Sequence, residues 1–426
     1  MKDKSYREKA VELDRNDPLA GYREAFIHPD EPLIYLDGNS LGKLPKKTAE
    51  ITGRLISEQW GKRLIRGWNE EWLDLPRRVA GKIARIVGAE ADEIFVGDST
   101  SVNLYKLAFG ALSHLKERKT IVTDSLNFPS DIYILRGIID SHFPRHKLET
   151  APGTEGTTTE SAALAKIIGS ETALVTLSHV TFKSSFKYDM PQINSLAKKA
   201  GSLMLWDLSH SAGAAALSLN DSEADMAVGC TYKYLNGGPG APAFSYIRGD
   251  LQERIQNPVR GWFGHEAPFD FDPSYKPARD ISQQAVGSPH ILSMAAVEPS
   301  LDLILEAGMD RISSKSRMQT TFIIESFDTH LKPLGFSLGT PRNPDARGSH
   351  VTIRHPESYR INQALIHPAG DVPAVIGDFR PPDNIRLGIA PLYTKFADLA
   401  ETIFRIREIV NTGEYERFSK TSNGVP

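Results

Sequence analysis

A lysine between two aromatic residues follows an apolar run near the middle of the chain. The run Met226–Cys230 is followed by Thr231, and then by Tyr232, Lys233 and Tyr234. Burial beside aromatic rings disfavours the charged ammonium, and a neutral lysine amine attacks a carbonyl carbon to form a Schiff base. Lys233 is therefore a candidate for holding a carbonyl ligand covalently. Taken by itself, however, such a motif more often contains a lysine that has only a packing role.

An aspartate and a histidine follow another apolar run upstream of this lysine. Leu203–Trp206 leads into Asp207, and His210 lies three residues further along. A carboxylate at the end of a buried strand is costly to desolvate unless it has a partner, and a protonated pyridine nitrogen would be one. Such a carboxylate keeps the ring positive, so that the ring can accept electrons. An aspartate that caps the next turn beside an ordinary hydrogen-bonded histidine explains the same residues equally well.

A turn rich in hydroxyl groups follows a third apolar run. Ile94–Gly97 is followed by Asp98, Ser99, Thr100 and Ser101. Small hydroxyl residues cap helices, and the free N–H groups and dipole at a helix N-terminus also bind phosphate. Capping alone more often explains such a turn. The order of phosphate-type turn, strand-end aspartate and strand-end lysine is nevertheless the order that a pyridoxal phosphate (PLP) site on an α/β sheet needs.

The elements that would position these residues alternate along the chain from Glu93 onward. The predicted strands are Ile94–Gly97, Thr120–Thr123, Ala173–Leu177, Leu203–Trp206, Met226–Cys230 and Ala243–Tyr246. Helical patterns lie between several of them, at Leu104–Leu115, Ile132–Ile139, Ala162–Ile168 and Pro191–Ala200. Apolar strands separated by helices predict a mostly parallel sheet with helices on both faces. Ligands of such sheets bind beyond the carboxyl ends of the strands, where the three motifs lie.

The rest of the chain predicts helices and a smaller unit. Helices are expected at 46–60 and after Pro76, and one long helix after about residue 295. Candidate C-terminal strands are His350–Arg354 and Asn384–Gly388. We expect a large α/β domain at 46–295, and a smaller α+β domain formed by 1–45 and 296–426.

Composition excludes several classes of function. A net charge of −3 among 426 residues argues against a nucleic-acid or anionic-membrane binder. The single cysteine, Cys230, can form neither an internal disulfide nor a thiolate-based zinc site. The charged N-terminus lacks the apolar core of a signal peptide, and no apolar run reaches about 18 residues. We expect a cytoplasmic protein without a metal.

The chain resembles the kynureninase family of fold-type-I PLP enzymes over about residues 35–395. The segments that carry the resemblance are Tyr35–Gly42, Phe128–Asp131, Asp207–His210, Tyr232–Asn236, Gly261–Glu266 and Asn384–Arg386. The first and the fifth discriminate best, because many PLP enzymes share the lysine motif. The resemblance implies a PLP-dependent transferase-like fold. It also implies the kynurenine pathway, in which L-kynurenine or its 3-hydroxy form is hydrolysed to an anthranilate and L-alanine, and it leaves open whether the reaction serves tryptophan catabolism or NAD biosynthesis.

The resemblance also implies how the cofactor is held. Lys233 would carry the Schiff base, Phe128 would stack on the ring, Asp207 would pair with the ring nitrogen, and His210 would support the ring or its O3′ side. The further cofactor neighbours would be Thr100, Ser101, Tyr232 and Trp262 at the phosphate, with Asp131 and Ser178 nearby. Trp262 and Ser288 would reach the phosphate of the partner subunit's cofactor, which implies a homodimer with shared active sites.

Substrate contacts follow from the same resemblance. Arg386 would clamp the α-carboxylate, whereas the residue type alone favours a surface ion pair. Asn39 and Trp68 are candidates for the aryl end. Lys233 would remove the Cα proton, and Tyr232 would protonate Cβ. Ser288 stands where asparagine or threonine is expected, which leaves the preference for the aryl ring open.

The same residues also fit other functions. An aminotransferase would share Lys233 and Asp207. A cysteine desulfurase needs a mobile catalytic cysteine, and Cys230 lies inside a predicted strand instead. A PLP-binding protein without turnover, or a nucleotide-binding protein, would be a different class, and neither phosphate motif of nucleotide-binding proteins is present.

Overall fold

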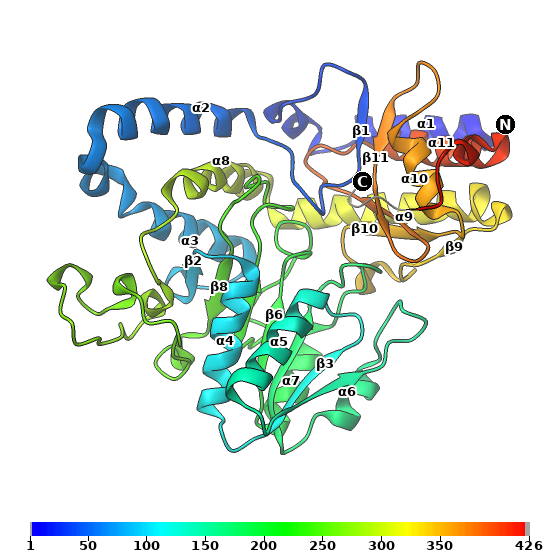
Figure 1. Cartoon of the computed structure of the whole chain (residues 1–426). Helices are drawn as coiled ribbons and strands as arrows, with labels where there is room; N and C mark the ends of the chain where they lie inside the picture. Colours follow the sequence, from blue (N-terminus) through cyan, green and yellow to red (C-terminus); the bar gives the residue numbers. More distant parts are fainter. Residues whose placement is uncertain (1, 422–426) are drawn as a thin grey trace.

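The computed structural model describes residues 2–421 of the chain. Figure 1 shows a large sheet beside a bundle of three helices, α1 (Lys2–Arg15), α9 (Met309–His330) and α11 (Phe396–Thr412). No helix in this described part is long and apolar enough to cross a membrane. Within the same residues, no group of three or more His, Cys, Asp or Glu side chains could hold a metal ion.

The large sheet has seven strands in the order β2-β8-β7-β6-β5-β3-β4. Their bounds are β2 Ile94–Val96, β3 Thr120–Asp124, β4 Lys147–Ala151, β5 Thr172–Ser178, β6 Leu203–Asp207, β7 Met226–Gly229 and β8 Phe244–Ile247. Strands β3 to β7 run parallel to one another, and only β8 opposes its two neighbours. The predicted mostly parallel sheet is confirmed. Strand β4 escaped prediction because it is an edge strand whose residues are largely exposed or half-buried, so it lacks an apolar run.

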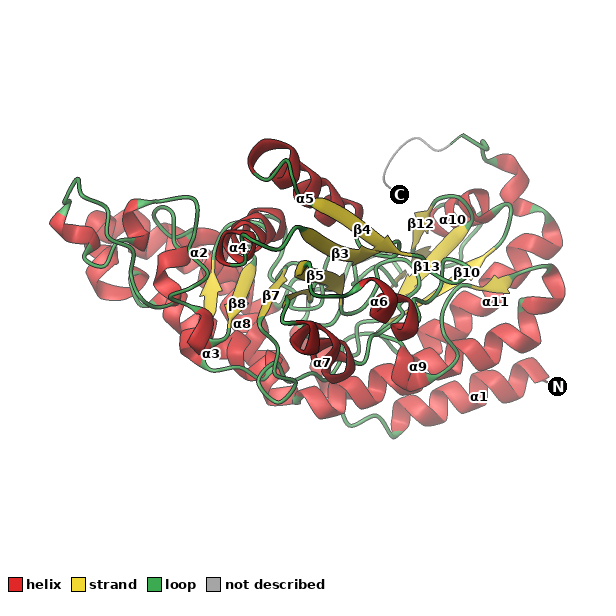
Figure 2. Cartoon of the chain, turned by 90° about the horizontal axis from the view of Figure 1, so that it is seen from below, coloured by secondary structure: helices red, strands yellow, loops and turns green. Residues whose placement is uncertain are grey.

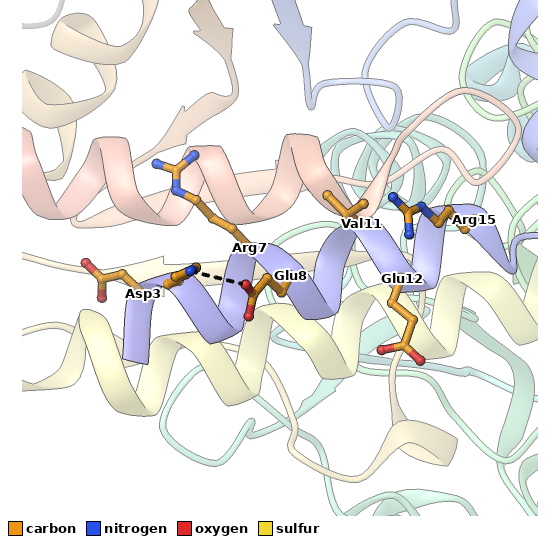
Figure 3. A pocket seen from close by; sticks show the side chains of 7 residues that line it. Asp3, Arg7, Glu8, Val11, Glu12 and Arg15 are labelled. Carbon is orange, nitrogen blue, oxygen red and sulfur yellow. Dashed lines mark ion pairs between the residues drawn. The ribbon is translucent and has the colours of Figure 1, made fainter. Parts of the chain in front are cut away.

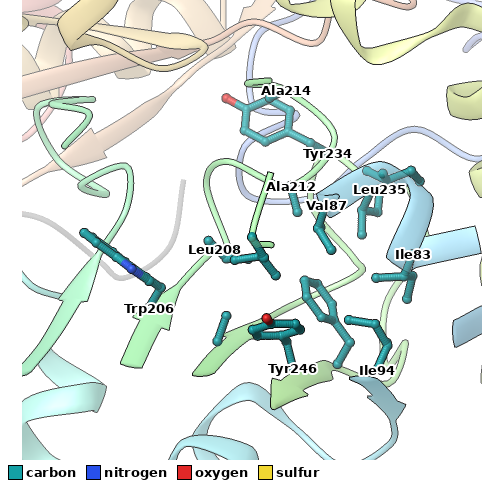
Figure 4. Close-up of a cluster of buried hydrophobic side chains, with 14 of the residues drawn as sticks. Ile83, Val87, Ile94, Trp206, Leu208, Ala212, Ala214, Tyr234, Leu235 and Tyr246 are labelled. Carbon is teal, nitrogen blue, oxygen red and sulfur yellow. The ribbon is translucent and has the colours of Figure 1, made fainter. Parts of the chain in front are cut away.

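Helices cover both faces of this sheet (Figure 2). Helices α4 (Thr100–His114) and α5 (Pro129–His142) pack with Leu203 and Leu205 of β6. The alternate residues of that strand, Met204 and Trp206, belong to a second core with α3 (Leu75–Val87), α7 (Met190–Ala200) and α8 (Ile291–Ala307), part of which is drawn in Figure 4. Helix α6 spans Ser161–Ile167. A strand buried on both faces explains why the sequence shows continuous apolar runs.

The N- and C-terminal segments share a separate core. An antiparallel sheet in the order β12-β13-β10-β9 packs there, with a parallel pair formed by β1 and β11. The bounds are β1 Leu33–Tyr35, β9 Ser337–Leu338, β10 His350–Arg354, α10 Ser358–Ile366, β11 Ala374–Ile376, β12 Asp378–Arg380 and β13 Asn384–Gly388. This core joins residues 10–36 to residues 322–409. The exact domain limits, 46–295 against 1–45 and 296–426, stay a prediction.

Two helix predictions need correction. The long helix expected after residue 295 is two helices, because Gly308 adopts a left-handed φ of 82° between α8 and α9. The helix expected at 46–60 is α2 (Lys46–Arg54), and it continues as a π-helical segment at Leu55–Arg63. Only Leu55 of that segment is buried, whereas Ile56 and Trp60 are exposed. Their apolar spacing therefore does not mark a face that packs within this chain.

Candidate active site

The carboxyl ends of the parallel strands bring the predicted residues to one edge of the large sheet. Ser178, the last residue of β5, is paired in register with Asp207, the last residue of β6. Asp207 in turn is paired with Val228 of β7, the strand that leads into Lys233. The turn after β3 carries Phe128 at the start of α5. Parallel strand order thus gathers residues that are far apart in the sequence.

Lys233 lies at the centre of this group. Its Nζ is 3.1 Å from Nε2 of His210 and 5.9 Å from the centroid of the Phe128 ring. Burial lowers the pKa of His210 far below its ordinary value, and the charge of Lys233 lowers it further. His210 is therefore neutral at physiological pH. The ring of Phe128, which is partly exposed, could cover a flat ligand beside the lysine.

Two buried carboxylates accompany the lysine. Burial raises the pKa of Asp207, while the charge of Lys233 and the hydrogen bonds from Ser209 oppose the rise. Burial also raises the pKa of Asp131 well above its ordinary value, and the neighbouring Asp207 adds to this effect. Oδ2 of Asp131 and Nδ1 of His210 have no hydrogen-bond partner within residues 2–421. Buried polar atoms of this kind need partners, so they suit a polar ligand.

The hydroxyl-rich turn is a helix N-terminus, as predicted. Ser99 caps α4, and its side chain accepts a hydrogen bond from the backbone N–H of Val102. Thr100 and Ser101 form the first turn, and Oγ of Ser101 lies 2.9 Å from Oγ of Ser130, beside Asp131. Both capping and anion binding are therefore possible here. A site with a lysine, an exposed phenylalanine ring beside it, a buried carboxylate and a helix N-terminus fits PLP.

Asn127 is a site residue that the sequence did not reveal. Its Oδ1 accepts from Oγ of Ser178 at 2.7 Å and from the backbone N–H of Phe128 at 2.9 Å. Its Nδ2 donates to Oγ1 of Thr123 at 3.1 Å. One amide therefore fixes two predicted cofactor neighbours across two strands. No local sequence signal distinguishes such an asparagine from a turn residue.

Arg386 is buried, so the prediction from its residue type alone, an ion pair at the surface, is wrong. Its side chain is 2% exposed and forms a two-pronged ion pair with Asp378 through Nε and Nη2. Nη2 also donates to Oγ of Ser40, and Nη1 donates to the carbonyl of Phe182. Phe182 packs against Phe128 with ring centroids 5.2 Å apart, so the guanidinium is linked to the residues around Lys233.

Residues of the segment Tyr35–Gly42 surround this arginine. Asn39 is fully buried, and in the amide orientation that satisfies both groups its oxygen accepts from Nε of Arg386 at 2.7 Å. Burial, and the nearby carboxylate of Asp378, raise the pKa of Asp37 to about 6. His350 of β10 is another buried neighbour that the sequence did not reveal, with its ring 5.5 Å from that of His210.

Close backbone contacts explain glycines in the two most discriminating segments. The N–H of Gly42 donates to the carbonyl of Tyr232 at 2.8 Å, and a Cβ at Gly42 would overlap the carbonyl oxygen of Lys233. A Cβ at Gly261 would likewise overlap the backbone of Val286. Only glycine permits these approaches.

Trp68, Trp262 and Ser288 lie in a different part of the molecule from the Arg386 cluster. Trp68 packs against Trp72 and Phe263, and Trp262 packs against Phe263 and the exposed Phe271. Ser288 lines a cavity of about 620 Å³ together with Asp98. A hollow of about 840 Å³ elsewhere is lined only by residues of α1, with alternating charges such as Lys4 and Glu8 (Figure 3), and it is not a candidate site.

Known proteins are similar in sequence to this chain over nearly its whole length. A family model described as the kynureninase C-terminal domain matches residues 312–406. A protein named kynureninase from Burkholderia mallei (strain SAVP1) is 40% identical over 411 residues, covering 95% of this chain and 96% of its own. A kynureninase from Pseudomonas fluorescens is 39% identical over 410 residues, covering 95% of each chain.

Solved structures share the fold. The apo cysteine desulfurase from Thermococcus onnurineus NA1 aligns with a TM-score of 0.78 at 18% identity, covering 94% of this chain and 98% of its own. A lysine-to-alanine mutant of C-DES, with glycine covalently linked to its PLP cofactor, aligns with a TM-score of 0.79 at 17% identity, covering 91% and 99%. The expected PLP-dependent transferase-like architecture is thereby confirmed. With the identity to its curated relatives extending over nearly its whole length, the chain belongs to the kynureninase family.

Proposed function

We propose that this chain is a PLP-dependent hydrolase that cleaves the Cβ–Cγ bond of L-kynurenine, or of 3-hydroxy-L-kynurenine. The products are anthranilate, or 3-hydroxyanthranilate, and L-alanine. The observation that carries the proposal is the meeting of Lys233, His210 and Asp207 at the strand ends of a chain from this family. We place the enzyme in the cytoplasm, in the kynurenine pathway.

The residues of the chain divide the work of binding the cofactor. Lys233 would attach it, Asp207 would hold the proton on its ring nitrogen, and Phe128 would cover one face of the ring. Thr100 and Ser101 offer hydroxyl groups and the N-terminal N–H groups of α4 to the phosphate. When bound, PLP supplies an electron-accepting ring for carbanion chemistry at the substrate.

Two residues then move protons. Lys233 would be the base that removes the proton from Cα of the substrate. Tyr232 is its neighbour, and burial raises the pKa of this phenol above its ordinary value. The phenol therefore keeps its proton at neutral pH, which suits a group that donates a proton to Cβ. A positioned acid or base of this kind accelerates a reaction by about 10²- to 10⁴-fold.

Arg386 binds the α-carboxylate of the substrate. A guanidinium has five N–H donors, and four of those of Arg386 are engaged by Asp378, Ser40 and Phe182. The remaining N–H on Nη1 is available to one oxygen of the substrate carboxylate. The N–H on Nη2 that now donates to Ser40 could donate to the second carboxylate oxygen instead. The two bonds to Asp378 fix the plane of the guanidinium. Asn39 and Trp68 are proposed for the aryl end. Because Trp68 lies apart from Arg386 within one chain, it would be contributed by a partner subunit.

The functional unit is proposed to be a homodimer with shared active sites. Trp262 is 41% exposed and stacks on Phe271, which is 73% exposed. Ile56, Trp60 and Ile65 add further exposed apolar side chains on the π-helical region and just after it. A partner subunit would cover these groups, and Trp262 and Ser288 would then approach its phosphate site.

The decisive experiment mixes the PLP-loaded protein with L-kynurenine and follows anthranilate fluorescence and L-alanine, with 3-hydroxy-L-kynurenine in parallel. Equal amounts of the two products establish the hydrolase, and the ratio of rates gives the preference. Conversion of the cofactor to its amine form, reversed by a 2-oxo acid, would instead identify an aminotransferase. Binding without either product would leave a PLP-binding protein without turnover.

A further inference from the structure

Lys106 is a buried lysine for which the reaction above has no use. It lies on α4, less than two turns after Ser101, and its side chain is 0% exposed. An ammonium removed from water is strongly unfavourable unless charged or polar partners replace the lost hydration. The groups that contact this ammonium therefore indicate its role.

The ammonium of Lys106 has two hydrogen-bond acceptors and one aromatic ring as its partners. Nζ donates to Oδ2 of Asp98 at 2.8 Å and to the backbone carbonyl of Gln284 at 2.8 Å. It also lies 4.5 Å from the centroid of the Phe95 ring, within the range of a cation–π contact. Burial lowers the pKa of Lys106, and the charge of Asp98 and its hydrogen bond oppose this change.

Asp98 is the residue that bends the chain into the phosphate-type turn. Its φ of 52° is left-handed, a conformation that residues other than glycine adopt only at a cost. The next residue, Ser99, is the N-cap of α4, and Thr100 and Ser101 follow. An unpaired carboxylate at this place would repel a phosphate. Lys106 both fixes the Asp98 side chain and neutralises its charge.

The second acceptor connects this turn to the segment that carries Ser288. Gln284 is buried and closes the short helical turn Ile281–Gln284, a few residues before Ser288. Asp98 and Ser288 line the same cavity of about 620 Å³. One ammonium therefore joins the turn that would bind the chain's own phosphate to the segment proposed to reach the partner's phosphate.

We propose that Lys106 is a positioning residue for the cofactor phosphate. By pairing with Asp98 and Gln284 it keeps the N-terminus of α4 in shape and free of net negative charge, without touching the cofactor. This inference rests on the proposed PLP site.

The test compares two ligands that differ only in the phosphate. The apo forms of the wild type and of Lys106→Met are titrated with PLP and with pyridoxal, and their melting temperatures are measured. The dissociation constant of Lys106→Met for PLP should rise by about tenfold or more, with that for pyridoxal changed less than about threefold. Equal weakening of both ligands, or unchanged PLP binding, would overturn the inference.

Lys315→Met is the matched control. Lys315 is likewise buried, and its Nζ pairs with Asp17 and with the carbonyl of Pro391, remote in sequence from the phosphate turn. This variant should lose thermal stability while keeping the wild-type affinity for both ligands. If Lys106→Met does not fold, Lys106→Gln replaces it, because an amide can still reach one of the two acceptors, and the same selective loss of PLP affinity is expected.

A double variant isolates the role of charge. Adding Asp98→Asn to Lys106→Met removes the unpaired carboxylate and should recover several-fold in PLP affinity, and a lack of recovery would overturn the neutralising role. Wild-type protein that binds neither ligand would instead contradict the PLP site itself, so the two failures are distinguishable.

Discussion

Nζ of Lys233 and Nε2 of His210 lie 3.1 Å apart, within hydrogen-bonding distance. Because burial and the lysine charge keep His210 neutral, its Nε2 can accept a hydrogen bond from the amine, and the imidazole proton then lies on Nδ1. That Nδ1 has no partner among residues 2–421. The histidine therefore orients the lysine on one side and keeps a free donor on the other.

The first prediction concerns Arg386. Lysine at this position would supply a point charge in place of a planar fork, so Arg386→Lys should raise KM for L-kynurenine by about tenfold or more. The PLP dissociation constant should stay near that of the wild type, because the change lies at the substrate end. Steady-state kinetics and cofactor titration check both points. Arg354→Lys, which alters a half-exposed arginine paired with Asp383, is the control and should leave KM unchanged. An unaltered KM in Arg386→Lys would remove this residue from the substrate site.

Much of this arrangement could be predicted from the sequence. The strands that end at Asp207 and before Lys233 are buried on both faces, so their apolar runs are plain and the residues after them must reach the ligand edge. Strand β4 and the break at Gly308 could not be predicted as easily. The exposed strand has no apolar pattern, and one glycine inside a helical pattern does not by itself end a helix.

Side-chain partners were the part that sequence could not supply. Arg386 pairs with Asp378 across two strands of the small sheet, and Asn127 links two strands of the large sheet. Lys106 donates a hydrogen bond to the carbonyl of Gln284, which is distant in the sequence. Each of these pairings is set by tertiary packing, and no spacing in the sequence encodes it.

The second prediction concerns the pH dependence of stability. Burial lowers the pKa of His179 from 6.5 to about 3, so the unfolded chain binds a proton between these values that the folded protein does not. The contribution of His179 to the free energy of unfolding is therefore present in full above about pH 6.5, and it is lost progressively as the pH falls. Over the interval from 6.5 to about pH 5 this one group should cost about 2 kcal/mol.

His179→Phe removes the titrating imidazole, so the fall in the free energy of unfolding between pH 7 and pH 5 should be smaller by about 2 kcal/mol in the variant. Urea denaturation of the wild type and the variant at about pH 5 and pH 7 measures the difference. The exposed His114, changed to Phe, is the control and should leave the slope unaltered. Parallel pH curves for wild type and His179→Phe would contradict a depressed pKa in the folded protein.

The third prediction tests the shared active sites. Trp262→Ala and Lys233→Ala should each lower activity, the first through the neighbouring site and the second within its own. A mixed dimer of the two variants contains one site with both Lys233 and Trp262 intact. Refolding or co-expressing equal amounts should therefore restore activity to about a quarter of the wild-type value, from half of the dimers with one site each. No recovery in mixed dimers confirmed by mass would show that Trp262 does not act across subunits.

Chemical trapping shows whether Lys233 is the lysine that holds the cofactor. The PLP-loaded protein is reduced with borohydride, digested, and analysed by mass spectrometry, with Lys233→Ala treated in the same way. We expect the pyridoxyl phosphate label on the peptide that contains Lys233, and no label in the variant. A label on another lysine, or an equal label in Lys233→Ala, would contradict it.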